Sequence, residues 1–161
     1  MRTFLVLILI ILNLPALAQT GASLPLPRFA SLRSEEVNLR SGPGVRYPID
    51  WVIQKRDLPV EIVAEYDTWR KIRDHQGAEG WVHQTMLSGR RGLIVTGTAE
   101  RLLRKSGDDN SHPVAKIEPG VMGKILQCPR NLNYCRIEVG GFQGWMDRND
   151  FWGVYRGEVI E

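Results

Sequence analysis

Apolar and polar residues alternate in short runs along most of this chain, and glycine-rich turns separate the runs. Val37 and Leu39 alternate with Asn38 and Arg40 before a Gly-Pro-Gly turn. A period of two is typical of a strand with one buried face. The same pattern predicts further strands over 51–55, 58–63, 68–74 and 79–82, and a helical turn over 83–87. These elements describe a five-stranded unit without a long helix.

The second half of the chain repeats this pattern. Leu103 corresponds to Leu39 and Trp145 corresponds to Trp81, and 42 positions separate the two landmarks in each half. Equal spacing indicates two copies of one unit, which are too few to build a solenoid. Short, evenly spaced strands predict small barrels or sandwiches. We therefore expect an all-β chain of two tandem five-stranded β-barrels.

The N-terminal segment has the pattern of a secretory signal peptide. Arg2 precedes an unbroken apolar run over 4–12, and Ala16-Leu17-Ala18 is a small-x-small cleavage site. The run is shorter than the roughly 20 apolar residues of a membrane-spanning helix. We expect cleavage after Ala18, no membrane span in the mature protein, and a periplasmic or secreted location.

These signals divide the chain into five segments. They are a signal peptide (1–18), an extended Pro-rich leader (19–34), a first barrel (35–88), a junction (89–97) and a second barrel (98–161).

Charge and cysteine content narrow the range of functions. The formal net charge is +3, and removal of Arg2 with the signal peptide leaves +2. Nucleic-acid binding requires clustered basic residues, so we predict no nucleic-acid partner. Cys128 and Cys135 lie seven positions apart, which is not the spacing of a C-x-x-C redox motif. In an oxidising compartment we favour a disulfide that braces a local hairpin over two free thiols.

Three motifs in the first unit resemble the bacterial Src-homology-3 domain family. They are Asn-Leu-Arg-Ser-Gly-Pro at 38–43, Trp-Arg-Lys-Ile at 69–72 and Gly-Trp-Val at 80–82. The second unit departs from the pattern, because Ser-Gly-Asp at 106–108 replaces Gly-Pro-Gly and Tyr134 replaces the tryptophan. The resemblance implies strongly bent five-stranded barrels that bind peptidoglycan or proteins. With the cysteine pair and the Trp-Gly-Val-Tyr tail, the tandem arrangement resembles exported two-unit proteins of alphaproteobacteria.

No group of residues has the spacing of a catalytic or metal site. His75, His83 and His112 lack metalloprotease spacing and are interpreted as exposed turn residues. Asp-Asp-Asn at 108–110 lacks the glycine and the distal glutamate of a calcium loop. Cys135 is expected in a disulfide. We therefore predict no enzyme activity, no metal and no cofactor.

Aromatic side chains are the remaining candidates for ligand binding. Alternation turns Leu39, Ile62, Ile72 and Val82 inward, which leaves Trp69 and Trp81 for the outer wall unless both are core residues. Exposed aromatics can stack on sugar rings or hold extended peptides. The expected ligand-binding residues are Arg40, Tyr47, Trp51, Tyr66, Trp69 and Trp81. We expect Trp145 and Trp152 to pack between the units instead.

These observations predict an exported, non-enzymatic protein that binds peptidoglycan or its stem peptides. The alternative is a periplasmic interaction scaffold that binds an extended peptide of a protein partner, or its own Pro-Leu-Pro leader at 24–27. A wall amidase would need a nucleophile or a metal site that the sequence does not display. No feature of the sequence specifies an oligomeric state or shows whether both units bind.

Overall fold

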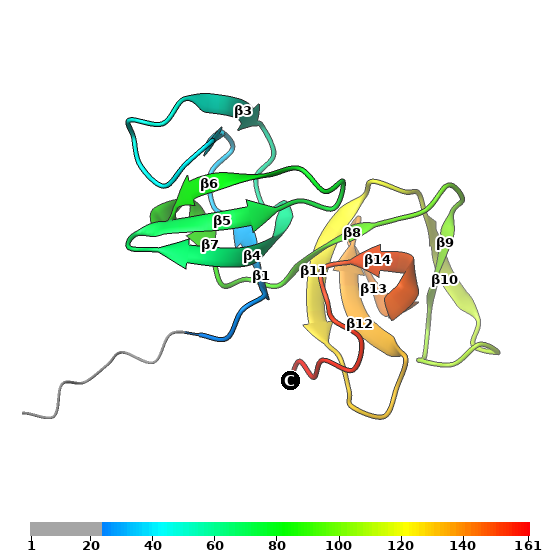
Figure 1. Cartoon of the computed structure of the whole chain (residues 1–161). Helices are drawn as coiled ribbons and strands as arrows, with labels where there is room; N and C mark the ends of the chain where they lie inside the picture. Colours follow the sequence, from blue (N-terminus) through cyan, green and yellow to red (C-terminus); the bar gives the residue numbers. More distant parts are fainter. Residues whose placement is uncertain (1–23) are drawn as a thin grey trace, which may run out of the picture.

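Seven strands and one short 3-10 helix build each half of the described chain, residues 24–161 of this computed structural model (Figure 1). The predicted signal peptide and its cleavage site lie outside the described residues. Within residues 24–161, no helix has both the length and the apolar character needed to cross a membrane. The predicted all-β fold of two tandem units is confirmed.

The elements follow one another in the same sequence in both units. The first unit comprises β1 (Arg28–Leu32), β2 (Val37–Arg40), β3 (Ile49–Ile53), β4 (Pro59–Tyr66), β5 (Trp69–Arg73), β6 (Glu79–His83), the 3-10 helix η1 (Gln84–Met86) and β7 (Leu87–Ser88). The second comprises β8 (Gly92–Val95), β9 (Arg101–Arg104), β10 (Pro113–Ile117), β11 (Met122–Gln127), β12 (Tyr134–Val139), β13 (Phe142–Asp147), the 3-10 helix η2 (Arg148–Asp150) and β14 (Phe151–Trp152).

The two sheets share one topology. The strand order β3-β2-β6-β5-β4-β1-β7 recurs as β10-β9-β13-β12-β11-β8-β14. The register also recurs, because Arg40 lies opposite Trp81 and Arg104 lies opposite Trp145. The landmark spacing in the sequence therefore reflects two structurally equivalent units.

Each sheet contains two strands more than the five predicted: β1 and β7 in the first unit, and β8 and β14 in the second. The boundaries of the segments shift because of β1 and β8. β1 comes from the segment 19–34, which was expected to be an extended leader, and β8 comes from the expected junction 89–97. Both strands are almost continuously buried. A strand that is buried on both faces is apolar at successive positions. Its sequence therefore lacks the alternation of apolar and polar residues by which a strand is recognised. The units therefore begin at Arg28 and Gly92, and the junction shrinks to 89–91.

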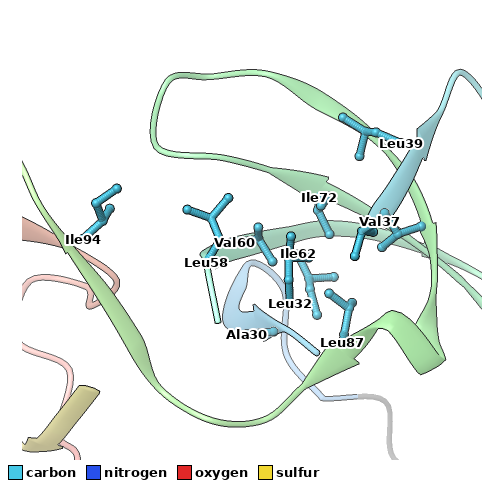
Figure 2. Packing of buried hydrophobic residues seen from close by; sticks show 11 residues of the cluster. Ala30, Leu32, Val37, Leu39, Leu58, Val60, Ile62, Ile72, Leu87 and Ile94 are labelled. Atoms are coloured by element: carbon cyan, nitrogen blue, oxygen red, sulfur yellow. The ribbon is translucent and has the colours of Figure 1, made fainter. Parts of the chain in front are cut away.

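The first core follows the predicted alternation. Leu39, Ile62, Ile72 and Val82 are almost fully buried and belong to one core cluster. Figure 2 shows Leu39, Ile62 and Ile72 within it. Gly80 lets β6 approach β2, since a Cβ at this position would overlap the side chain of Leu39. The second unit repeats this contact between Gly144 and Leu103.

Strand β8 contributes to two cores. Leu93 and Val95 belong to the core of the second unit, whereas Ile94 between them belongs to the core of the first. Figure 2 shows Ile94 projecting from its strand beside Leu58. Alternate residues of one strand point to opposite faces, so β8 is buried between the two units.

Aromatic residues extend the contact between the units. The ring of Phe29 in β1 packs edge-on against Trp152 at 4.8 Å and lies 4.6 Å from Tyr155, measured between centroids. The Tyr155 hydroxyl donates to a carboxylate oxygen of Glu61 at 2.7 Å. Trp152 therefore lies between the units as expected. Trp145 does not, because it packs beside Gly107 within its own unit.

Hydrogen bonds also fix the segment between the units. The Ser31 hydroxyl donates to the Arg90 carbonyl and accepts from the Gly92 N–H. Arg91 donates to both carboxylate oxygens of Glu158 near the C-terminus. Burial alone would raise the pKa of Glu158, but the bonds from Arg91 and from the Tyr155 N–H outweigh it and lower that pKa.

A disulfide bond cross-links the second unit. Cys128 and Cys135 form a disulfide with a Cα–Cα distance of 4.3 Å, which confirms the predicted bridge. It ties the end of β11 to β12. Cys128 also exchanges two backbone hydrogen bonds with Ile160, at 2.7 and 3.1 Å. The C-terminal segment is thereby attached to the braced hairpin.

A buried arginine holds the same region. Arg148 in η2 is buried, and its guanidinium donates to the carbonyl oxygens of Leu132, Pro129 and Glu158 at 3.2, 2.8 and 2.6 Å. A buried cation is tolerated only when such acceptors replace water. Arg148 therefore joins the β11–β12 connection to the C-terminal segment.

Candidate ligand-binding groove

Arg40 anchors the β2–β3 loop (residues 41–48). Its Nη1 donates to the carbonyl oxygens of Val45 and Tyr47, at 3.2 and 2.7 Å. Arg104 in the second unit makes the equivalent bond to the Ser111 carbonyl, also seven residues ahead, at 2.8 Å. Because both units use this bond, the structure gives Arg40 a positioning role in shaping the groove.

Tyr47 fills the inside of the same loop. A Cβ on Gly42 would overlap the Tyr47 ring, so the ring occupies the space that this glycine leaves free. The Arg46 guanidinium lies 5.3 Å from the centroid of that ring, within the range of a cation–π contact. The Gly-Pro-Gly turn is therefore packed against its own tyrosine and presents a defined surface.

Trp69 and His83 form the wall that faces this loop. They are register partners on β5 and β6, and their rings meet edge-to-face with centroids 5.6 Å apart. The Nδ1 atom of His83 lies 2.8 Å from the hydroxyl of Thr85, and it accepts the Thr85 N–H at the start of η1. These contacts fix the imidazole, which in turn orients the Trp69 indole. Trp69 is half-buried, with part of its surface open to solvent.

An open hollow of about 460 Å³, termed the Trp69 groove, lies between this wall and the β2–β3 loop. Its lining residues are Pro43, Gly44, Val45, Arg46, Thr68, Trp69 and His83. The lining combines an aromatic surface with one arginine and contains no carboxylate. Such a surface suits a ring or an extended chain that carries hydrogen-bonding or anionic groups.

The expected site residues take different places around this groove. Tyr66 is exposed at the end of β4, directly opposite Trp69 in the register. Trp81 lies on the outer face of β6 between Arg40 and Lys71. Trp51 is exposed on β3 and does not line the groove. Of the six expected residues, only Trp69 lines the groove, and Arg40 and Tyr47 hold the loop that faces it. The groove lining does not include Tyr66, Trp81 or Trp51.

Six of the seven residues that line the groove were not among the expected site residues: Pro43, Gly44, Val45, Arg46, Thr68 and His83. His83 had been interpreted as an exposed turn residue. Its position two residues after Trp81 places it on the same face of β6, so alternation alone would have identified it. Arg46 and Thr68 lie in turns, where no period indicates the direction of a side chain.

Charges on the outer wall beyond the groove are already paired. Lys71 and Arg73 each lie 2.6 Å from a carboxylate oxygen of Glu79. Hydrogen bonds from Lys71 and then from Arg73 lower the pKa of Glu79. This stretch of wall therefore offers little free charge to a ligand, and Arg46 is the cation that lines the groove.

The equivalent position in the second unit has different chemistry. Tyr134 replaces Trp69 and Asp147 replaces His83 in the same register pair. The Tyr134 hydroxyl donates to Asp109, and this bond, followed by burial, raises the pKa of Tyr134 to about 12. The adjoining hollow of about 380 Å³ is bordered by four carboxylates and two arginines: Glu100, Asp109, Asp147, Asp150, Arg101 and Arg104. The second unit thus offers an acidic hollow with a buried, hydrogen-bonded tyrosine.

The described part of the leader does not enter the Trp69 groove. Leu24 lines a separate hollow with Arg70 and Gln84, beside β1. Arg28 continues the leader into β1 and pairs with Glu65, which also pairs with Arg70 at 2.9 Å.

Comparisons with known proteins identify a family for the first unit. Residues 33–89 match the family model described as bacterial SH3 domain. Over 156 residues the chain is 26% identical to the protein named "Putative N-acetylmuramoyl-L-alanine amidase YrvJ" from Bacillus subtilis (strain 168). That match covers 90% of this chain and 30% of the relative, so the chain spans less than a third of the relative's length.

Two solved structures from Trichomonas vaginalis are also similar. NlpC1 is 14% identical with a TM-score of 0.36, over 86% of this chain and 50% of that one. NlpC2 is 13% identical with a TM-score of 0.36, over 83% of this chain and 50% of that one.

The family match falls on the unit that carries the Trp69 groove. It includes the loop held by Arg40, the Trp69 strand and the Gly80-Trp81-Val82 segment, which are the motifs singled out in the sequence. The chain therefore contains a bacterial SH3 domain, at residues 33–89.

Proposed function

We propose that this protein is exported, has no enzyme activity, and binds peptidoglycan or its stem peptides through the Trp69 groove. The observation that carries the proposal is an open groove in which a half-exposed tryptophan faces a loop held by internal hydrogen bonds. A preformed surface loses little conformational freedom when it binds a ligand. The similarity to a protein named as an N-acetylmuramoyl-L-alanine amidase supports the cell wall as the proposed ligand.

Groove chemistry supports binding over catalysis. The lining supplies no cysteine and no carboxylate, and the Nδ1 atom of its single histidine is engaged by Thr85. Acyl transfer needs a nucleophile with an adjacent base, or a metal with an open position. Within residues 24–161, no three His, Cys, Asp or Glu side chains are grouped to hold a metal ion.

Export is supported by the disulfide. The bridge between Cys128 and Cys135 would be reduced in most cytosols and persists in oxidising compartments. The signal-peptide pattern of the first 18 residues points to the same location. Cell fractionation with N-terminal sequencing of the mature protein tests this part directly: a cytoplasmic, uncleaved chain would contradict it.

Co-sedimentation with purified peptidoglycan tests the ligand. We expect the mature protein to pellet with the wall, and Trp69→Ala to weaken binding by about tenfold through loss of the aromatic surface. Tyr134→Phe is the matched control, because it alters the equivalent position of the second unit and leaves the groove intact. Circular dichroism verifies that both variants remain folded.

Two outcomes would overturn the proposed ligand. One is a protein that stays in the supernatant at all wall concentrations. The other is a folded Trp69→Ala variant that pellets as well as the native protein. In either case, crosslinking in the periplasm would test the interaction-scaffold alternative.

A further inference from the structure

The edge strand β3 of the first unit presents apolar side chains to solvent. It is the outermost strand of its sheet, so one of its backbone edges has no partner strand within the described part of the chain. Ile49, Trp51 and Val52 are 45%, 69% and 46% exposed. Exposed, apolar edge strands pair readily with a further strand. β3 therefore has the properties of an interaction surface.

The second unit carries a protected version of the same edge. The registers of the two edge strands align three pairs of residues: Ile49 with Pro113, Trp51 with Ala115, and Val52 with Lys116. Proline removes a backbone donor, and lysine resists burial against a second strand. β10 exposes one large apolar side chain, Val114, where β3 exposes three, and its proline and lysine disfavour strand addition.

The fold of the first unit does not require these exposed side chains. Trp51 and Val52 lie outside the buried core cluster, and neither lines the Trp69 groove. The equivalent alanine and lysine of β10 are compatible with the same topology in the second unit. Ile53 of β3 packs against the core, but the exposed Trp51 and Val52 side chains do not belong to it.

We propose that β3 pairs with the β3 strand of a second copy of this chain, in antiparallel orientation about a two-fold axis. The strand is complementary to itself in charge: Asp50 lies near its beginning, and the exposed Lys55 follows its end. An antiparallel pair brings Asp50 of each copy toward the basic end of the other, so the attraction occurs twice.

The same pairing is unfavourable for β10. Two copies of that strand would bring two Lys116 side chains together and would place Pro113 where a backbone donor is needed. The dimer therefore forms through the first unit and leaves the second unit free. Pairing of two β3 strands joins two seven-stranded sheets, and it does not depend on what the Trp69 groove binds.

Sedimentation velocity of the exported protein, from micromolar to hundreds of micromolar, tests this proposal. We expect the weight-average mass to rise toward twice the monomer mass. A variant that gives β3 the residues of β10 (Ile49→Pro, Trp51→Ala, Val52→Lys) should raise the dimer dissociation constant at least about tenfold. If the triple variant does not fold, the single variant Val52→Lys is measured in its place.

The matched control is Lys116→Val in β10, which should leave the dissociation constant unchanged. A native protein that is monomeric at every concentration overturns the proposal, and makes an extended segment of another protein the occupant to test. A dimer that forms as tightly in the folded β3 variants also overturns it, because the interface would then lie elsewhere.

Discussion

The two units share one topology but differ in how their outer parts are held. In the first unit, the Trp69 groove is open, and the β2–β3 loop is positioned by noncovalent contacts alone. In the second, Asp109 of the equivalent loop accepts from Tyr134, and a disulfide and the buried Arg148 hold the β11–β12 connection. Features present in both units identify the scaffold, and features present in only one identify specialisation.

The shared features are few and specific. Both units use an arginine to hold the loop after the second strand, a glycine for close approach of two strands, and inward aliphatic residues for the core. The differences lie on the outer face. An aromatic and basic groove in one unit has an acidic counterpart in the other, so we expect the units to bind different ligands.

The largest expected effect comes from Arg148. Arg148→Met leaves three carbonyl oxygens without their donor, so we expect the free energy of unfolding to fall by about 3 kcal/mol. Urea denaturation measures the change. Arg136→Met, an exposed arginine of the same unit, is the control and should lower stability by less than about 0.5 kcal/mol. Equal losses in the two variants would show that Arg148 is not the anchor of the C-terminal segment.

Removal of the disulfide should have the next largest effect. Replacing Cys128 and Cys135 by serine removes a short cross-link and should cost about 2 kcal/mol. Chemical reduction of the native protein should give the same loss. Because the bridge lies in the second unit, binding through the Trp69 groove should persist in the folded variant. A loss of binding without unfolding would place the ligand site across both units.

The loop-holding arginines provide a matched pair. Arg40→Ala and Arg104→Ala each remove hydrogen bonds to loop carbonyls, and each should cost about 1 kcal/mol of stability. Only Arg40→Ala should weaken wall binding, because only that loop lines the Trp69 groove. Denaturation and co-sedimentation separate the two effects. Equal loss of wall binding in both variants would assign a ligand site to the second unit as well.

The smallest expected effect concerns the ionisation of Tyr134 at high pH. The pKa of Tyr134 is raised to about 12, so its bond to Asp109 contributes stability fully below pH 10 and loses it as the pH rises from 10 through 12. Ultraviolet difference spectra should show this tyrosine ionising late. Asp109→Asn should move that ionisation to lower pH. An unchanged titration would mean that Asp109 does not hold the hydroxyl.

The alternation of apolar and polar residues was sufficient to predict the strands that have one buried and one solvent-exposed face. Leu39, Ile62, Ile72 and Val82 point inward as expected, because each alternates with polar neighbours. β1 and β8 were missed because the contact between units and the rest of each core covers both their faces. Burial on two sides is a tertiary property that leaves no period in the sequence.

The groove was predicted only in part for a related reason. Trp69 was identified from its place on the outer face of β5, but the direction of Arg46 depends on a loop that Arg40 folds back. Arg148 was missed entirely, since an arginine in an Arg-Asn-Asp turn has the composition of an exposed loop. Its burial depends on acceptors from two segments, the β11–β12 connection and the C-terminal segment, that are distant from each other in sequence.

The placement of β8 has a consequence for how this molecule unfolds. Neighbouring residues of that strand complete different cores, so neither unit can lose its structure without exposing apolar surface of the other. Cooperativity in denaturation should therefore extend across both units and give one transition. In topology there are two barrels, but in unfolding we expect them to behave as one cooperative domain.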